Sequence, residues 1–514
     1  MKHVLVEANR YFDSVFLMRI SREIESLPDV RQAVVAMGTR ANLDSLVAVG
    51  FTLEESGEPI LPNDFVIAID GGSEEAIRRA RTRLEELLAG STDEGGAAAE
   101  RPRSLREALE VDPGANVALI SVPGGYAARE ARQALRRGLH VMLFSDNVSV
   151  EDEVMLKEEA VERGLLMMGP DCGTAILNGV PLGFANACRR GAIGIVGASG
   201  TGIQEISSLV HRLGGGISQA IGTGGRDLSA DVGAQMTRFG IDALAGDPST
   251  EVIVVVSKTP APEVAQSVID TLAAAGKTGV IHFVGAPGRE THDQIRFAGT
   301  LEQAAVFACE AAGLEVTGPE PTRLPATAGN ATDKPTAGRL VGLFCGGTLC
   351  QEAWSLLDQA GIDVVSNVAF DPTKKVHPEA RVAGSVLWDL GDDAFTVGRP
   401  HPMIEPSLRD ERVANAGSDP GIGIVLVDCV IGYGAHDDPA GNLAKAVRRA
   451  FAAARAEGRE LIVLASVTGT DLDPQNAPAQ KKKLEHAGVI VAESNAAAVR
   501  IAIDLLKPSR EDRS

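Results

Sequence analysis

The stretch Ile193–Leu209 reads IGIVGASGTGIQEISSL, which is a short apolar run, a glycine-rich turn and then a segment suited to a helix. The pattern returns at Leu340–Leu356 as LVGLFCGGTLCQEAWSL. Gly200 recurs as Gly347 and Glu205 as Glu352, so the two copies are 147 residues apart (347 minus 200). Each copy predicts a strand, a tight turn and a helix, and the repetition predicts two related parallel-sheet domains.

The two turns predict a site for anions. The first N–H groups of a helix have no partner within the helix, and the helix dipole is positive at that end, so phosphate and carboxylate groups bind there. We therefore expect the turns to hold two anionic groups, through Ser199, Gly200, Thr201, Gly346, Gly347 and Thr348. Glu205 and Glu352, one helical turn further on, are expected to support the site. The alternative is that duplicated α/β units keep these glycines for turns and close packing, with no ligand.

Composition sets the class of protein. A chain of 514 residues is expected to form about three or four domains. Aromatic residues make up only 4%, so the cores must consist of Ala, Val, Leu and Ile, as in helices packed on parallel strands. The net charge of −20 argues against nucleic acid or an anionic membrane as partner. No apolar stretch reaches the length of about 20 residues that a membrane span needs, and the start of the chain is charged, so we expect a cytoplasmic protein.

Six cysteines are spread along the chain without a C-x-x-C pair, so neither a disulfide framework nor a metal site is expected. Cys345 and Cys350 flank the second turn. A thiolate of low pKa is chemically possible at a helix start, but buried, reduced cysteine is the favoured interpretation.

Four domains are predicted, all of the α/β class. Residues 1–90 alternate strand and helix as a small N-terminal α/β domain, and residues 104–186 follow the βαβαβ order of a Rossmann-like, parallel-sheet unit. Residues 190–315 and 338–508 carry the first and second copies of the repeat as Rossmann-like or flavodoxin-like domains. The segments between them, rich in Gly, Ala, Pro and Thr, are interpreted as linkers. The turn Pro123–Gly125 lacks G-x-G-x-x-G, so a nicotinamide dinucleotide site is not supported.

Two polar loops carry the catalytic candidates. Within the dense polar run Asp389–Pro406, Arg399 could hold a carboxylate or phosphate and His401 could act as a general acid. Arg226 and Asp227 are comparable candidates on a glycine loop. The alternative is that these loops are turns whose Asp and Arg residues satisfy backbone groups. The supporting candidates, besides the two glutamates, are Gly224, Gly225, Asp392 and Cys172.

Ser199 does not match a nucleophile elbow, because residue 201 is Thr where G-x-S-x-G requires Gly. Its hydroxyl is expected to cap the helix.

Several longer segments resemble known families. The stretches ALISVPGG (118–125), GPDCGT (169–174) and GASGT (197–201) resemble the α subunit of succinyl-CoA synthetase. Over essentially the whole length, the chain resembles the FdrA family, through FSDNV (144–148), GGRDLS (224–229), TVGRPHPMI (396–404), VIGYGA (430–435) and VTGT (467–470).

The synthetase resemblance implies a CoA-binding-like domain at residues 104–186 and ligase-like domains at 190–315 and 338–508. The synthetase carries a phosphorylated histidine in a Gly-His-Ala-Gly-Ala context. Here His292 lies near the corresponding place without that context, and the chain has no ATP-grasp domain.

The FdrA resemblance implies a subunit of an oxamate carbamoyltransferase of allantoin breakdown, which converts oxalurate and phosphate to oxamate and carbamoyl phosphate together with other subunits. No cofactor is firmly implied, because phosphate and carbamoyl phosphate are substrates. Our hypothesis is that phosphate at one turn attacks the carbamoyl carbon. The other turn, with Arg226 or Arg399, would hold the oxamate part, and His401 or Asp227 would donate a proton.

Two alternatives stay open. The first is an acyl-CoA ligase that depends on CoA and on ATP or ADP. The second is a noncatalytic scaffold subunit that binds a metabolite while partner subunits catalyse.

Overall fold

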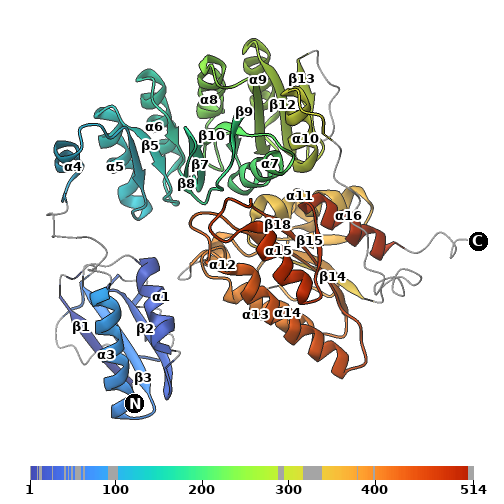
Figure 1. The fold of residues 1–514 in the computed structure, drawn as a ribbon. Helices are drawn as coiled ribbons and strands as arrows, with labels where there is room; N and C mark the ends of the chain where they lie inside the picture. Colours follow the sequence, from blue (N-terminus) through green and yellow to red (C-terminus); the bar gives the residue numbers. More distant parts are fainter. Residues whose placement is uncertain are drawn as a thin grey trace, which may run out of the picture. The chain divides into compact units, whose positions relative to one another are not determined.

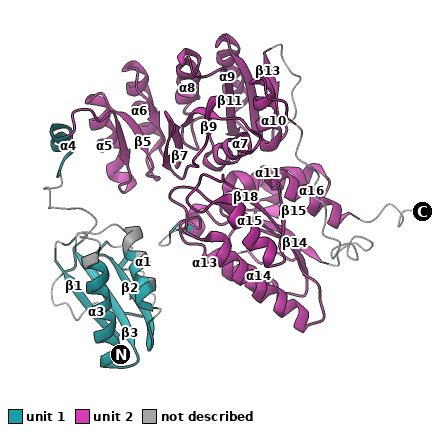
Figure 2. Cartoon of the chain, in the orientation of Figure 1, with its two compact units in different colours: residues 1–111, 396–400 teal, residues 112–395, 401–514 magenta. Residues whose placement is uncertain are grey.

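The computed structural model describes residues 2–90 apart from 9, 11–13, 26, 40–41, 44–45, 48–49, 53–58 and 62–63, and then residues 102–286, 294–316, 338–378, 380–396 and 400–507. The chain forms two compact units, one of residues 1–111 with 396–400 and the other of residues 112–395 with 401–514 (Figure 2). No helix among these residues is long and apolar enough to cross a membrane.

The first unit is a small α/β domain, as predicted, but its sheet is antiparallel. The strands lie in the order β1-β3-β2, and β3 pairs antiparallel with both neighbours. The apolar face of the first helix, including Ile20 and Ile24, is buried with Phe65 and Ile67 of the sheet. Its elements are β1 (Lys2–Glu7), α1 (Ser14–Glu25), β2 (Val30–Met37), β3 (Phe65–Gly71), α3 (Glu74–Gly90) and α4 (Leu105–Val111).

The second unit begins with the predicted βαβαβ segment. Its three strands are parallel in the order β4-β5-β6. The elements are β4 (Val117–Ile120), α5 (Gly124–Arg136), β5 (His140–Leu143), α6 (Val150–Glu162) and β6 (Met167–Met168). The predicted end of this domain at residue 186 needs correction, because the hairpin of β7 (Thr174–Leu177) and β8 (Val180–Gly183) pairs with the next sheet through β10.

The domain with the first repeat is built on a seven-stranded sheet of order β13-β12-β11-β9-β10-β7-β8, parallel except for the hairpin (Figure 1). The repeat supplies the central strand β9 and the helix α7 that follows it. The elements are β9 (Arg190–Ala198), α7 (Gly200–Arg212), β10 (Ile217–Gly222), α8 (Gln235–Gly246), β11 (Val252–Lys258), α9 (Pro262–Ala274), β12 (Thr278–Val284), β13 (Ile295–Phe297) and α10 (Leu301–Ala311).

The domain with the second repeat has a wholly parallel sheet of order β15-β16-β14-β17-β18-β19. Its repeat again supplies a central strand, β14, and the following helix, α11. The elements are β14 (Arg339–Phe344), α11 (Gly347–Gln359), β15 (Val364–Ser366), a 3₁₀ turn (Pro372–Lys374), β16 (Ser385–Asp389), α12 (Asp393–Thr396), α13 (Ser407–Ala416), β17 (Ile422–Val430), α14 (Pro439–Ala456), β18 (Ile462–Thr468), α15 (Ala477–His486), β19 (Ile490–Ala492) and α16 (Asn495–Leu506).

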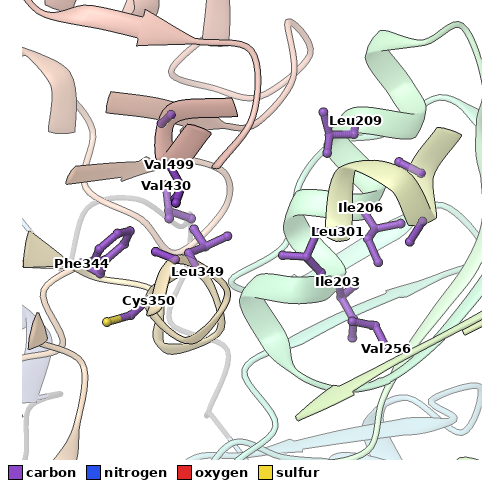
Figure 3. Close-up of a cluster of buried hydrophobic side chains, with 14 of the residues drawn as sticks. Ile203, Ile206, Leu209, Val256, Leu301, Phe344, Leu349, Cys350, Val430 and Val499 are labelled. Carbon is purple, nitrogen blue, oxygen red and sulfur yellow. The ribbon is translucent and has the colours of Figure 1, made fainter. Parts of the chain in front are cut away.

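The two repeat domains share one hydrophobic core. Ile203 and Ile206 of α7 belong to the same buried cluster as Leu349 of α11 and Val499 of α16 (Figure 3). Helices α7 and α11 are also in contact with each other. The shared core fixes the two repeats face to face, so the turns at their helix starts are brought together.

Candidate functional site

The two glycine turns meet at one place. Ser199 Oγ and Thr348 Oγ1 share a hydrogen bond of 2.7 Å, although they are 149 residues apart. A Cβ added to Gly346 would lie 2.9 Å from Thr201 Cγ2, so the turns approach each other as closely as glycine allows. All three of these side chains are buried. We call this place the junction. The two helix starts therefore face one place, as expected of a single site formed by both turns.

The first turn is capped as predicted. Ser199 Oγ accepts a hydrogen bond of 3.1 Å from Gly202 N, which is the usual N-cap geometry. The strands beside β9 carry no carboxylate at the turn, because Gly197 pairs with Gly222 on one side and with Val256 on the other. Lys258 ends β11 directly after Ser257, which pairs with Ala198. The strands that flank this turn thus place no carboxylate beside it, and one of them ends in Lys258.

The second turn is acidic, which corrects its predicted role. Gly197 corresponds to Phe344 in the second copy, and Phe344 pairs with Asp389 at the end of β16. Asp428 of β17 accepts hydrogen bonds from Cys345 N at 2.8 Å and Gly346 N at 2.7 Å. The carboxylate of Asp428 already occupies the N–H group of Gly346, which we expected to bind an anion. The anion-binding role predicted for Gly346 is therefore wrong, whereas the roles of Gly347 and Thr348 stay predictions.

The carboxyl groups at this edge of the sheets have raised pKa values. Burial raises the pKa of Asp389 to about 7, and nearby Lys258 opposes the shift. Burial also raises the pKa of Asp428. Partial desolvation raises the pKa of Asp171 toward about 6, but the residue is exposed to solvent, which limits the shift, and Lys258 opposes it as well. Lys258 therefore lies where it acts on carboxyls from two different domains.

Glu205 and Glu352 hold the two repeat domains together instead of contacting the turns. Glu205 accepts hydrogen bonds from Asn495 N at 3.1 Å and Thr468 Oγ1 at 2.5 Å in the other repeat domain. Glu352 accepts from Leu301 N at 2.7 Å and from Asn495 Nδ2 at 2.8 Å. Each glutamate thus binds the first N–H of a helix in the opposite domain. Their predicted role in supporting the anion site is corrected to reciprocal helix capping.

The glycine loop of the first repeat domain is structural. Arg226 donates to Glu153 Oε2 at 2.9 Å and to Val148 O at 2.8 Å. Asp227 is fully buried and accepts from Lys157 Nζ at 2.8 Å and from Thr237 N at 2.8 Å and Oγ1 at 2.6 Å. Because Asp227 is fully buried and engaged, the structure contradicts its predicted catalytic role, whereas the side chain of Arg226 is 44% exposed and its role stays a prediction.

His401 is also unsuited to its predicted role. Its Nδ1 accepts a hydrogen bond from Met403 N at 3.2 Å, and its ring packs on Phe184 with centroids 5.7 Å apart. Burial lowers the pKa of His401 to about 4, so the ring is uncharged at neutral pH. A neutral imidazole is a weak proton donor, and the expectation of a general acid at His401 is corrected.

The remaining candidates divide into structural residues and residues that lie outside the described part of the chain. Asp392 Oδ1 accepts from Ala394 N at 3.0 Å at the start of α12. Gly224 has φ +85°, and a Cβ there would lie 2.2 Å from Pro170 O, so this loop needs glycine for close approach. Gly225 faces Asp171, since a Cβ would lie 3.3 Å from its Oδ2. Arg399 and His292 lie outside the described residues.

The thiols are inert, in agreement with the favoured interpretation. All six cysteines are free, and all except Cys188 are buried. Burial raises the pKa of Cys172 to about 12 and holds the pKa of Cys345 and Cys350 well above the ordinary value. The supporting role predicted for Cys172 is therefore one of packing, and no thiolate forms at the second turn.

The sequence places Asp389 in the polar run, where we gave it no role, and we did not predict Asp428 or Lys258. Each of the three lies at or near the carboxyl end of a strand that flanks a repeat strand. The sequence did hold a sign of these three residues, because each is a polar residue that ends or interrupts an apolar run. In parallel sheets such residues lie at the edge where ligands bind.

Three family models match the chain. A CoA-ligase model matches residues 343–505, a CoA binding domain model matches residues 189–285, and a model described as AllF, heavy metal-associated domain, matches residues 1–103. The CoA-binding match falls on the first repeat domain, whereas the sequence predicts CoA-binding likeness for residues 104–186.

Relatives cover the chain to different extents. The uncharacterized protein YahF of Escherichia coli strain K12 is 44% identical over 496 residues, which is 96% of each chain. The chain belongs to the YahF family. The α subunit of ADP-forming succinate–CoA ligase of Aquifex aeolicus is 30% identical over 161 residues, covering 30% of this chain and 51% of that subunit. The predicted α/β architecture with succinyl-CoA synthetase-like domains is confirmed.

Solved structures show only a distant likeness. ATP citrate lyase of Methanothrix soehngenii, in complex with citrate and coenzyme A, is 13% identical and covers 78% of this chain and 83% of its own, with a TM-score of 0.34. Because the TM-score is so low, this likeness supports no statement about what the chain binds.

The residues of the first unit do not fit the heavy metal in the name of its family model. Heavy metals select soft thiolate ligands. Residues 1–103 contain no cysteine, and His3 is their only histidine. We therefore assign no metal to this unit.

Proposed function

We propose that this chain is a subunit of a carbamoyltransferase that exchanges a carbamoyl group between phosphate and a small amide acid, with oxamate as the acceptor that the FdrA resemblance favours. The observation that carries the proposal is the asymmetry of the junction. The strands that flank the first helix start carry no carboxylate beside it and one of them ends in Lys258, whereas the facing helix start is lined by Asp389 and Asp428. A transfer from nitrogen to phosphate needs an anion site and a proton-bearing site side by side.

In the proposed reaction, phosphate binds at the first turn, where Gly200 and Thr201 begin α7 and Lys258 lies on the adjoining strand. Lys258 forms no ion pair within the described part of the chain, so its charge is available to an anionic substrate. The phosphate oxygen attacks the carbamoyl carbon of oxalurate, and the bond from that carbon to the oxamate nitrogen breaks. Lys258 thus takes a role at the phosphate turn that the sequence hypothesis gave to no charged side chain, and Arg226 or Arg399 stays the proposed holder of the oxamate part.

The AllF domain model matches residues 1–103, outside the residues 189–285 and 343–505 that the two CoA-related models match. We take this additional domain as support for a function other than CoA ligation. The expectation of partner subunits rests on the names of the ligase relatives. Succinate–CoA ligase relatives are named as subunits of larger enzymes, and we propose that this chain also works in a heteromeric complex.

An acyl-CoA ligase is the second candidate, because the CoA-ligase and CoA binding domain models together match both repeat domains. That activity would add CoA and a nucleotide to the substrates and would need a nucleotide-binding partner. In a noncatalytic scaffold, by contrast, substitutions at the junction would not change the activity of the complex.

The test is release of phosphate from carbamoyl phosphate, with and without oxamate, by the complex purified through a tag on this chain. A parallel reaction contains CoA, ATP and small carboxylic acids. Oxamate-dependent release without CoA supports carbamoyl transfer, and Lys258→Ala should then reduce it. CoA-dependent turnover of nucleotide with no response to oxamate would reject carbamoyl transfer in favour of the ligase.

A further inference from the structure

Hydrogen bonds hold the backbone and one carboxyl oxygen of Asp389 in place at the junction, and its other carboxyl oxygen accepts none from the described residues. Asn367 binds both backbone groups of Asp389, since its Nδ2 donates to Asp389 O at 3.0 Å and its Oδ1 accepts from Asp389 N at 2.9 Å. Asp389 Oδ1 accepts from Gly391 N at 3.0 Å. For Oδ2 there is no hydrogen bond to any described residue. The residue as a whole is only 7% exposed, but Oδ2 keeps contact with solvent, so this largely buried carboxyl has one oxygen that a substrate can reach.

That free oxygen points at the start of the second repeat helix. A Cβ added to Gly347 would lie 2.5 Å from Asp389 Oδ2, so the absence of a side chain at Gly347 makes room for the carboxyl. The next residue, Thr348, is the one that bonds Ser199 across the junction. Asp428, by contrast, has both oxygens engaged with backbone N–H groups. Asp389 is therefore the carboxyl of this pair that can meet a substrate.

The charges around Asp389 come from several elements. Lys258 of β11 favours its charged form, whereas Asp392 of the same loop and Asp428 of β17 disfavour it. Cys350 of α11 is electrostatically coupled to it. With burial as the main cause, the pKa of Asp389 is raised to about 7, so both the acid and the carboxylate are populated near neutral pH. This is the property that His401, with a pKa of about 4, lacks.

We propose that Asp389 is the proton carrier of the transfer reaction, an inference that rests on the proposed function. As the phosphate oxygen bonds to the carbamoyl carbon and the bond to the oxamate nitrogen breaks, the acid form of Asp389 gives its proton to that nitrogen. The carboxylate then takes the proton that the phosphate loses. Asp389 thus gives up one proton and takes one back in each turnover, so no further proton donor or acceptor is needed. In the reverse reaction Asp389 makes the same two proton transfers in the opposite order.

The test compares the wild-type complex with Asp389→Asn, which keeps the size and the acceptor for Gly391 N but cannot carry the proton. Asp363→Asn is the control, because the side chain of Asp363 is 96% exposed. We expect Asp389→Asn to lower kcat by about 10²–10⁴-fold and to remove the dependence of kcat/KM on a group that titrates near pH 7. The control should match the wild type.

Sulfate binding, followed by thermal unfolding, gives a second measurement on the same variants. Sulfate does not titrate between pH 6 and pH 8, so a change in its affinity reports on the protein. We expect wild-type affinity to fall by about tenfold over this range as Asp389 ionises beside the anion, and Asp389→Asn to bind with little pH dependence.

The outcomes separate the two proposals. A wild-type complex without carbamoyl transfer overturns the proposed function, and the proton step with it. An active wild type with an equally active Asp389→Asn overturns the role of Asp389 alone. If Asp389→Asn is inactive but keeps the wild-type pH dependence of sulfate binding, Asp389 does not face the anion and the inference is wrong.

Discussion

Glu352 should make the stability of the second unit depend on pH in a way that Glu352→Gln removes. The carboxyl is fully enclosed between the two repeat domains and accepts from Leu301 N at 2.7 Å and Asn495 Nδ2 at 2.8 Å. Burial raises its pKa from an ordinary 4.5 to about 7, and the nearby carboxyls of Glu205 and Glu302 add to the shift. The folded state therefore holds this proton more tightly than the unfolded state does.

The sign follows from that difference in pKa. The contribution of Glu352 to stability is fully present below about pH 4.5 and is lost as the pH rises through about 7. A difference of about 2.5 pKa units corresponds to a loss of about 3 kcal/mol once the group is ionised. Glutamine cannot ionise, but its amide nitrogen stands where Glu352 has a second accepting oxygen. The loss of that hydrogen bond should lower the free energy of unfolding by about 1 kcal/mol at every pH.

At pH 5 about 1 kcal/mol of the wild-type contribution is already lost, so Glu352→Gln should closely match the wild type there and be more stable by about 2 kcal/mol at pH 8.5. Urea unfolding followed by circular dichroism at both pH values measures the difference. Glu485→Gln, on an exposed position of α15, is the control and should follow the wild type throughout. The reasoning is refuted if Glu352→Gln is destabilised by the same amount at both pH values.

Three further changes have defined outcomes. Ser199→Ala removes the N-cap of α7 and the bond to Thr348, and should lower the free energy of unfolding by about 1–2 kcal/mol in a urea titration, whereas an unchanged value would show that neither bond matters. Asp227→Ala leaves fully buried Lys157 with one carboxylate fewer and should cost about 3–5 kcal/mol, so a soluble variant as stable as the wild type would contradict the structural role given to Asp227. Iodoacetamide at pH 7.5 should label no thiol of the native protein within minutes, because burial raises the pKa values of the cysteines, and rapid labelling of Cys345 detected by mass spectrometry would be inconsistent with the structure.

Sequence periodicity was sufficient to predict the parallel-sheet domains and the two helix starts. The repeat at Gly200 and Gly347 specified both turns, and an apolar run before each turn predicted its strand. That the two turns touch could not be read from the sequence, because their contact depends on a core shared between domains.

The asymmetry of the junction was not predictable from the motif. Asp389 and Asp428 become neighbours of the second turn only through strand order, which places β16 and β17 on either side of β14. Both copies of the repeat carry a glutamate, Glu205 and Glu352, and the motif alone suggested that these residues support the anion site. Glu205 meets Asn495, which is 290 residues away, so its role in capping depends on tertiary structure alone.

The most direct test of the central claim is a crystal structure of the protein grown with sulfate. We expect a sulfate ion at the first turn, bound by the N–H groups of Gly200 and Thr201 and facing Lys258, with Asp389 on the opposite side of the junction. A sulfate ion at the second turn, on Gly346 and Gly347, or a junction without sulfate at saturating concentration, would contradict it.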